Sequence, residues 1–570
     1  MAASAFTKRN LKGLQLHFPG SPEYERSVAT GNLEYRYETP LFVANATEIS
    51  HVTAVVELAN KLGIKLTMKG GGHSFGGFSN SLDGILLDMS GMRKVKLETI
   101  DISKDDNSLG GIVTLQAGAL WGDAYRLLID KQINKYTIMG GRCPAVGVGG
   151  FTMGGGLCIF TRSYGMGIDQ LKEATLVTVN KEGVVEVHTV TENDTDSKKK
   201  DLFWAIRGCG GGNYGVLVEM KMKFHKLFDK EGKVTSGQLV LRPAGNDEAA
   251  VKELIDSIKP LHTANWPDAF TMDSFWVCDT SDQSQLTMSF PIYHNGNKAD
   301  FDKILNDLLP GSNLASQLSK AAIEEKYTLF LQETLPDQLR DDMLRYCPLN
   351  KTYNLNSSFV FNNDGDTIDK VAKDMEELIK GFRRDFLGSK SILELKMIHG
   401  GGKANRVGAD ETAFPWRKGV YFGHIMVQWT DKSLGKPMSG FFEESKKKLM
   451  QHSLEGRAAF INFTDRTLEE RDYPYAYYGA HYQRLQGIKQ VWDPLDTFRF
   501  MQSIRLPASE SPVRPQELGG FNQSSEDVNS RWERYVQPDI GFDELVKAEG
   551  HSCASCSKWV FLTVYMRELC

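Results

Sequence analysis

The sequence predicts an α+β protein of two domains, and three observations lead to this prediction. The chain has 570 residues, which is too long for one compact core. Its first 235 residues alternate short helical and strand patterns with many glycine turns. From about residue 236 longer amphipathic helices alternate with strands, a pattern typical of a sheet covered by helices.

Within the first block, a helix is expected directly after Thr47, whose hydroxyl can cap the N-terminus. Short apolar runs at 64–68 and 84–90 are typical of buried strands. The segment 113–128 has the pattern of a strand that turns into a helix. The apolar positions of the first helix recur at helical spacing: Val52, Val55, Val56, Ala59 and Leu62.

Composition and charge exclude several classes of function. The formal net charge of -5 gives no electrostatic reason to expect nucleic acid or an anionic membrane as a partner. The N-terminus lacks the apolar run of a secretory signal, and no stretch of 18 apolar residues predicts a membrane span. Eight cysteines without regular spacing do not resemble a disulfide framework. These observations predict a cytoplasmic protein.

Glycine is concentrated in three stretches, at 69–77, 147–156 and 207–215. Glycine clusters mark tight turns or a close approach of the backbone to a ligand. Three such stretches predict one ligand wrapped by several loops, although turns without a ligand would explain any single stretch. The last stretch contains GxGxxG, but an alternating strand follows it, whereas a Rossmann loop opens a helix.

Two residues beside these loops can carry chemistry. In KGGGHS the successive backbone N–H groups can form a nest for a pyrophosphate, and His73 lies in that nest. Cys143 lies beside the second glycine loop. An isolated cysteine is more often a small buried hydrophobe, so Cys143 alone decides nothing.

A series of motifs carries a resemblance to a known family. In order and spacing the series resembles the berberine-bridge-enzyme-like family of the vanillyl-alcohol-oxidase superfamily of flavoproteins. The resemblance is strong over about 35–225, good over 455–505 and weaker between them. The motifs are KGGGHSFGG, LLDMS, LQAGALWGD, GGRCPAVGVGGFTMGGGLCIFTRSYGMGIDQL, DLFWAIRGCGGGNYGVLVEM and YYGAHYQRLQGIKQVWDPLDTFRFMQSI.

The resemblance implies a domain plan around bound FAD. Residues 1–235 would form a PCMH-type FAD-binding domain of two α+β subdomains, and 456–507 would complete it. Residues 236–455 would form an inserted substrate domain with an antiparallel sheet covered by helices. The tail at 508–570 extends past the family's usual end and has the composition of a linker or surface wrap.

The resemblance also implies two covalent bonds to the flavin. His73 would bond the 8-methyl carbon and Cys143 would bond carbon 6 of the ring, which raises the reduction potential. The alternative is a singly attached flavin, with Cys143 unbonded. The other positions expected at the cofactor are Gly70, Gly71, Gly72, Ser74, Gly77, Val146, Gly147, Gly149, Gly150, Gly154, Gly215, Val218 and Tyr482.

Val146 occupies the family position that governs oxygen access to the reduced flavin. In family members valine there accompanies oxidase behaviour, and a bulkier leucine accompanies poor oxygen reactivity. The resemblance therefore favours an oxidase over a dehydrogenase. A purely packing role is the alternative.

The catalytic base departs from the family pattern. Phe463 stands where many members place a tyrosine, and Phe422 stands where some place a glutamate. On an extended strand His424 shares a face with Phe422, which makes it a candidate base. Tyr478 and His481 are competing candidates. Relatives usually carry asparagine in place of His481, so this chain has a titratable ring near the expected edge of the flavin. A structural histidine at 424, and packing against the cofactor for the other two, are the alternatives.

The C-terminal tail holds a possible but incomplete zinc pattern. Only one C-x-x-C pair is cleanly spaced, so we expect no metal. The residues concerned are His551, Cys553, Cys556 and Cys570.

The expected activity is that of an FAD-dependent oxidase with O2 as acceptor and H2O2 as product. Its small-molecule substrate would be an alcohol, amine or phenol-type group of a specialised metabolite, with ring formation as one outcome. The alternatives are a redox-neutral cyclase with a structural flavin, a carbohydrate oxidase and a non-catalytic flavin-bound protein. The sequence defines neither the substrate nor the oligomeric state.

Overall fold

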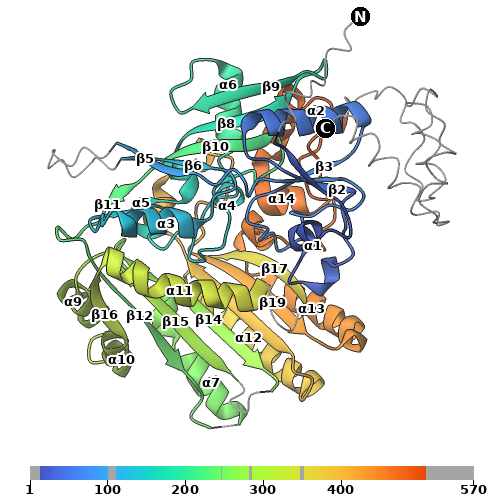
Figure 1. Ribbon diagram of the computed structural model, residues 1–570. Coiled ribbons are helices and arrows are strands. Elements are labelled where there is room, and N and C mark those ends of the chain that lie inside the picture. The colour runs from blue at the N-terminus through green and yellow to red at the C-terminus, as the bar shows by residue number, and fades with distance from the viewer. Residues whose placement is uncertain (1–12, 100–110, 246, 282–285, 347–351, 509–570) are drawn as a thin grey trace, which may run out of the picture.

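The computed structural model describes residues 13–99, 111–245, 247–281, 286–346 and 352–508. Figure 1 shows two domains, the first formed by blue to teal segments and the second by green to orange segments. The orange-red C-terminal helices return to the first domain, so two distant parts of the chain build it. The zinc pattern and the tail after 508 lie outside the described residues.

The first domain contains two separate sheets. The four-stranded sheet has the order β1-β2-β4-β3, with parallel pairing except at β1. The five-stranded sheet has the order β5-β6-β10-β8-β9 and is antiparallel throughout. The strands are β1 (Gln15–His17), β2 (Phe42–Asn45), β3 (Leu66–Lys69), β4 (Ile85–Asp88), β5 (Val95–Thr99), β6 (Ile112–Gln116), β8 (Leu171–Val179), β9 (Val185–Thr191) and β10 (Val216–Lys223), with the small pair β7 (Tyr136–Thr137) and β11 (His225–Lys226).

Helices join and cover these sheets. The helices before the second domain are α1 (Pro22–Val28), α2 (Ile49–Leu62), α3 (Trp121–Asp130), α4 (Val148–Met153), α5 (Thr161–Tyr164) and α6 (Ser197–Ala205). The returning C-terminal helices are α14 (Tyr473–Tyr478) and α15 (Tyr482–Trp492). Leu485, Phe498 and Ile504 of the C-terminal segment are buried in the same core as the first domain's strands. This shared core explains why the two ends of the chain form one domain.

The start of α2 corrects one expectation. Thr47 does not cap the helix, because Glu48 occupies the N-cap position and α2 begins at Ile49. The Thr47 hydroxyl instead lies 3.1 Å from Nδ1 of His51, and the Thr47 backbone N–H donates to the same atom. The helix ends at Leu62, and Gly63 caps it with a left-handed φ of 64°.

The second domain contains one antiparallel sheet of eight strands, with the order β16-β12-β15-β14-β18-β19-β17 and β13 paired to β15. Its first strand begins at Lys233, three residues before the expected boundary at 236. The strands are β12 (Lys233–Leu241), β13 (Phe270–Met272), β14 (Ser274–Asp279), β15 (Thr287–His294), β16 (Ala322–Lys326), β17 (Tyr353–Phe361), β18 (Ile392–His399) and β19 (Tyr421–Trp429).

The two faces of this sheet have different partners. Leu393, Leu395 and Met397 of β18 pack in a core with the covering helices. Alternate residues point to the other face, where Ile398 packs in a cluster with Leu157 of the first domain. The helices of the second domain are α7 (Glu248–Ser257), α8 (Lys259–Thr263), α9 (Lys298–Leu308), α10 (Asn313–Ala321), α11 (Tyr327–Tyr346), α12 (Gly365–Phe386) and α13 (Gly435–Met450).

Two arginines connect the two domains. Arg142 donates two hydrogen bonds to the fully buried carboxylate of Asp273 in the second domain. Arg417 of the second domain makes an equivalent bidentate contact with Asp169, at 2.8 and 3.0 Å. Such fork-like pairs fix geometry as well as charge, so they hold the domains in one relative position.

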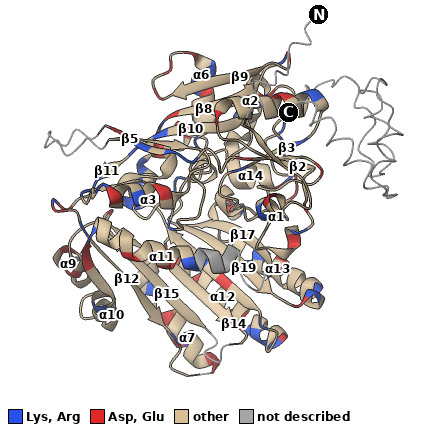
Figure 2. Cartoon of the chain, in the orientation of Figure 1, with Lys and Arg blue, Asp and Glu red and all other residues tan. Residues whose placement is uncertain are grey.

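The surface carries charges of both signs. Figure 2 shows Lys and Arg interspersed with Asp and Glu on outer helices such as α7 and α13. No helix among the described residues is both long and apolar enough to span a bilayer.

Candidate active site

A cavity of about 770 Å³ lies where the two domains meet. The first domain and the C-terminal segment supply glycine-rich loops and aromatic rings, and the second domain supplies side chains from its sheet and from α11. The volume falls within the range of about 300–1,000 Å³ usual for ligand sites. All three glycine stretches of the sequence reach this one cavity.

Two of the glycine loops touch through their backbones. A Cβ added at Gly71 would lie 2.4 Å from the backbone N of Gly147, and the converse contact is equally short. Only glycine permits this approach at both positions. The loop 70–72 directly follows β3, and the loop before Gly147 leads into α4, so the ends of two elements form one wall.

The backbone of the first loop has hydrogen-bonding capacity for a ligand. No described residue accepts a hydrogen bond from the backbone N–H of Gly71, Gly72 or Ser74. These three residues are partly or fully exposed, and successive N–H groups of this kind form a nest for phosphate oxygens. The cavity volume and this backbone cradle therefore fit a dinucleotide such as FAD.

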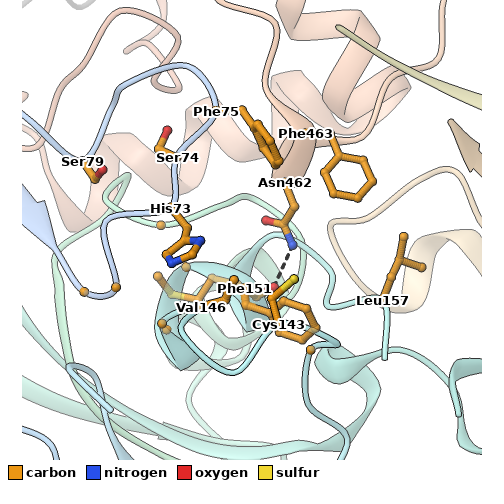
Figure 3. A pocket seen from close by; sticks show the side chains of 18 of the residues that line it. His73, Ser74, Phe75, Ser79, Cys143, Val146, Phe151, Leu157, Asn462 and Phe463 are labelled. Atoms are coloured by element: carbon orange, nitrogen blue, oxygen red, sulfur yellow. Dashed lines mark hydrogen bonds between the residues drawn. The ribbon is translucent and has the colours of Figure 1, made fainter. Parts of the chain in front are cut away.

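His73 and Cys143 point into the cavity from two different loops (Figure 3). His73 is the fourth residue after β3, and Cys143 precedes α4. Burial lowers the pKa of His73 to about 4, so its imidazole is neutral and nucleophilic near pH 7. Cys143 is partly exposed. Val146 lies on the same wall as Cys143 (Figure 3).

The expected cofactor residues divide into two groups. Gly77, Gly154, Val218 and Tyr482 are not part of the described cavity wall. Gly154 instead faces Asn462, and the hydroxyl of Tyr482 accepts a hydrogen bond from the backbone of Arg505. The residues that line the cavity are Gly70, Gly71, Gly72, His73, Ser74, Cys143, Val146, Gly147, Gly149, Gly150 and Gly215.

His424 is the one candidate base on the described cavity wall. It is 2% exposed, and its ring lies 4.6 Å from that of Phe75 and 5.2 Å from that of Phe463. Phe422, two residues earlier on β19, packs in an apolar cluster with Phe460 and does not reach the described wall.

A chain of amides fixes the orientation of His424. Asn356 donates its Nδ2 hydrogen to Asn354 at 2.8 Å, so its Oδ1 faces Nε2 of His424 at 3.0 Å. Because a carbonyl oxygen only accepts, Nε2 of His424 carries the hydrogen. In the neutral ring the other nitrogen, Nδ1, is then the atom able to accept a proton.

Tyr478 and His481 lie away from the described cavity wall. The Tyr478 hydroxyl donates to the carbonyl of Cys209 at 3.0 Å, and its side chain is fully buried. His481 contacts Asp410 and the carbonyl of Ala413 at 3.0 and 3.2 Å. Tyr478 precedes and His481 follows a sharp turn at Gly479. This turn directs both side chains into packing contacts.

Several cavity residues were not identified from the sequence. Some of them lie on strands of the second domain, where alternation of side chains was the only available signal. Asn462 was missed too, and its Nδ2 donates to the Phe151 carbonyl at 2.8 Å, as the dashed line in Figure 3 shows. The missed residues from the sheet and from α11 include Gln238, Phe275, Tyr293, Phe330, Lys396 and Ile398.

Comparison with known proteins bears on this site. Residues 40–188 match the family model described as FAD binding domain, and 459–505 match the one described as berberine and berberine like. Berberine bridge enzyme-like 7 of Arabidopsis thaliana is 26% identical over 493 residues, covering 82% of this chain and 86% of the relative. Glucooligosaccharide oxidase of Sarocladium strictum is 25% identical over 516 residues, covering 86% and 92%.

Solved structures share the fold. A berberine bridge enzyme in complex with (S)-reticuline has a TM-score of 0.70 at 20% identity, covering 88% of this chain and 98% of that one. An Acremonium strictum glucooligosaccharide oxidase, described as having a novel flavinylation, has a TM-score of 0.67 at 22% identity, covering 87% and 97%.

The fold, the glycine cradle and the matched domains define an FAD-linked oxidoreductase. The chain is similar to the berberine-bridge-enzyme-like proteins, and its residues 459–505 match the family model of that name. The resemblance in the sequence is thereby confirmed, and so is the α+β fold.

Proposed function

We propose that this protein is an oxidase that holds FAD through His73 and Cys143 and uses O2 as its electron acceptor. Its substrate would be a small metabolite with an alcohol, amine or phenol-type group. The observation that carries the proposal is that His73 and Cys143, 70 positions apart in the sequence, face one cavity beside a backbone cradle for phosphates.

The two attachment residues would act at different positions on one ring. The neutral imidazole of His73 is a competent nucleophile. Cys143 lies on the opposing loop, so attachment there would hold the ring from a second direction. FAD held there would supply the hydride acceptor for the substrate, and its reoxidation by O2 would release H2O2.

His424 is our candidate for the base that receives the substrate proton at Nδ1. Asn356 holds its Nε2, and the rings of Phe75 and Phe463 pack beside it. These aromatic rings exclude water from one side of the imidazole. Proton removal by a base held in this way supports hydride departure from the adjacent carbon.

Val146 is proposed to leave oxygen access open. It lies beside Cys143 on the cavity wall, where its small side chain leaves space that a leucine would occupy. A Val146→Leu variant is therefore expected to slow reoxidation by O2 while leaving anaerobic reduction by substrate nearly unchanged.

The attachment is tested by denaturing the holoenzyme in acid and mapping the flavinylated peptides by mass. Two modified positions, His73 and Cys143, are expected. Release of flavin into the supernatant would contradict the covalent proposal, and a His73 peptide alone would leave single attachment. A Cys143→Ala variant should keep its flavin and show a shifted absorbance spectrum.

The reaction is tested by measuring H2O2 against product during turnover. A one-to-one ratio is expected for an oxidase. Product without peroxide would favour the redox-neutral cyclase. A panel of metabolites and oligosaccharides, scored by anaerobic bleaching of the flavin, also separates the metabolite oxidase from a carbohydrate oxidase, which the Sarocladium relative makes a specific alternative.

A further inference from the structure

A chain of three asparagines connects the first domain to the candidate base. Asn32 precedes the short 3-10 helix η1 (Leu33–Tyr35) of the first domain, and its backbone forms a bridge with the residue just before β17. Asn354 and Asn356 lie on β17, and His424 lies on the neighbouring strand β19. Asn32, Asn356 and His424 are 8%, 5% and 2% exposed. Water therefore has little access to these side chains.

The backbone fixes the amide of Asn32. Its side-chain oxygen accepts hydrogen bonds from the backbone N–H of Glu34 at 3.1 Å and from that of Asn354 at 3.2 Å. Its side-chain nitrogen donates to the backbone carbonyl of Asn354 at 3.0 Å. Because a backbone N–H only donates and a carbonyl oxygen only accepts, the amide of Asn32 has a single orientation.

This orientation is passed along the chain to the imidazole. The side-chain nitrogen of Asn32 also donates to Oδ1 of Asn354 at 3.0 Å, which identifies that atom as an acceptor. The same oxygen accepts from Nδ2 of Asn356 at 2.8 Å, so Oδ1 of Asn356 faces Nε2 of His424 at 3.0 Å. A reversal at Asn32 would reverse each amide in turn, and the hydrogen of the neutral imidazole would move from Nε2 to Nδ1.

We propose that Asn32 is a positioning residue that sets the tautomer of His424 from across the domain interface. The inference rests on the proposed function, in which Nδ1 of His424 receives the substrate proton. Asn32 is not part of the described cavity wall, so it acts through the two other amides. A catalytic histidine in the wrong tautomer loses its function as a base although its ring stays in place.

The variant Asn32→Asp tests the chain by exchanging one nitrogen for oxygen. One carboxylate oxygen still accepts from the two backbone N–H groups, and the other now faces Asn354 and can only accept. The amides of Asn354 and Asn356 are then expected to rotate, so that Nδ2 of Asn356 donates to Nε2 of His424. The measurement is made at about pH 8.5, where a carboxyl group is ionised.

A second substitution should restore the original tautomer. In the double variant Asn32→Asp/Asn356→Asp, the side-chain nitrogen of Asn354 can donate one hydrogen to each carboxylate. The carboxylate at position 356 then accepts from Nε2 of His424 again. Asn297→Asp makes the same exchange at the N-cap of α9, away from the described cavity wall, and is the control.

Neutron crystallography of the holoenzyme locates the imidazole hydrogen of His424 directly. The hydrogen is expected on Nε2 in the wild type, the double variant and Asn297→Asp, and on Nδ1 in Asn32→Asp. Anaerobic flavin reduction is followed by stopped flow with any compound that bleaches the wild-type flavin. Its rate should fall about 10²-fold in Asn32→Asp, as expected for loss of a general base, and recover about tenfold in the double variant.

Three outcomes would overturn the proposal: a hydrogen on Nδ1 in the wild type, a hydrogen on Nε2 in Asn32→Asp, and a double variant as slow as Asn32→Asp. If Asn32→Asp does not fold, Asn32→Ser replaces it, because serine keeps the helix cap and lacks the amide donor. A hydrogen wholly on Nε2 in that variant contradicts the proposal. The hydrogen position requires no turnover, so its result is separable from failure of the oxidase proposal.

Discussion

The two sides of the cavity are built in different ways. The first domain contributes mainly backbone, through loops whose glycines approach one another within van der Waals distance. The second domain contributes side chains from strands far apart in the sequence, such as Phe275 and His424. A backbone surface binds a constant ligand, whereas side chains can vary with the substrate on an unchanged sheet. The difference teaches that cofactor and substrate recognition can be altered independently in this protein.

The largest expected effect concerns the side-chain wall. His424→Gln should lower the rate of anaerobic flavin reduction by about 10²–10⁴-fold, the usual contribution of a general base. The rate is measured by stopped flow with any compound that bleaches the wild-type flavin. His481→Gln, whose ring contacts Asp410 away from the cavity, should leave it nearly unchanged. Equal losses in both variants would contradict the assignment.

The contact between the two sides can be broken at Arg142. Arg142→Met leaves the carboxylate of Asp273, fully buried, without its cation, which should cost about 3–5 kcal/mol of unfolding free energy. Urea unfolding measures the loss. Arg484→Met removes an exposed pair with Asp201 and should cost about 0–1 kcal/mol. A similar cost for both variants would show that Arg142 does not fasten the domains.

The second domain should be sensitive to acid. Burial lowers the pKa of His262 and of His294 to about 4, from the ordinary value of about 6.5. The unfolded chain therefore binds protons that the folded domain does not, and stability falls as the pH decreases from 6.5 to about 4. The loss is about 3 kcal/mol for each histidine.

The contribution of one histidine is measured from unfolding free energies at several pH values. His262→Phe should flatten the pH dependence, because a phenyl ring fits among Trp276, Phe290 and Tyr421. His17→Phe, at a partly exposed position of β1, serves as the control. An unchanged slope in His262→Phe would assign the acid sensitivity elsewhere.

The backbone side is tested by the smallest possible substitution. Gly71→Ala should lower the free energy of unfolding by about 1–3 kcal/mol, because the added methyl group meets the backbone of Gly147. The expected result is a lower flavin-to-protein ratio in the purified enzyme. Gly440→Ala, with open space around its Cβ on α13, should keep the ratio of the wild type. A full flavin load in Gly71→Ala would show that the two loops can separate.

Much of the flavin side was predictable from the sequence. Each of the three glycine stretches is a continuous run in the sequence, so their meeting at one ligand could be expected before the fold was known. His73 lies within one of these stretches. Gly77 and Tyr482 belong to the expected segments but lie off the described wall. The sequence motif identifies the loop to which a residue belongs. The direction of each side chain depends on the conformation of the turn.

The sequence alone determined the fold class and the glycine loops, because these depend on local backbone requirements and on hydrophobic periodicity. The FAD-binding domain followed from the resemblance of its motifs to a known family. Only the tertiary structure decided which candidate base faces the cavity. His424, Tyr478 and His481 are equally polar in the sequence, but strand register directs the first into the site and helix packing directs the others away. Phe275, Lys396 and His424 lie side by side on the sheet because strands distant in the sequence pair with one another. Such long-range register is set by the packing of the whole sheet, and no local pattern encodes it.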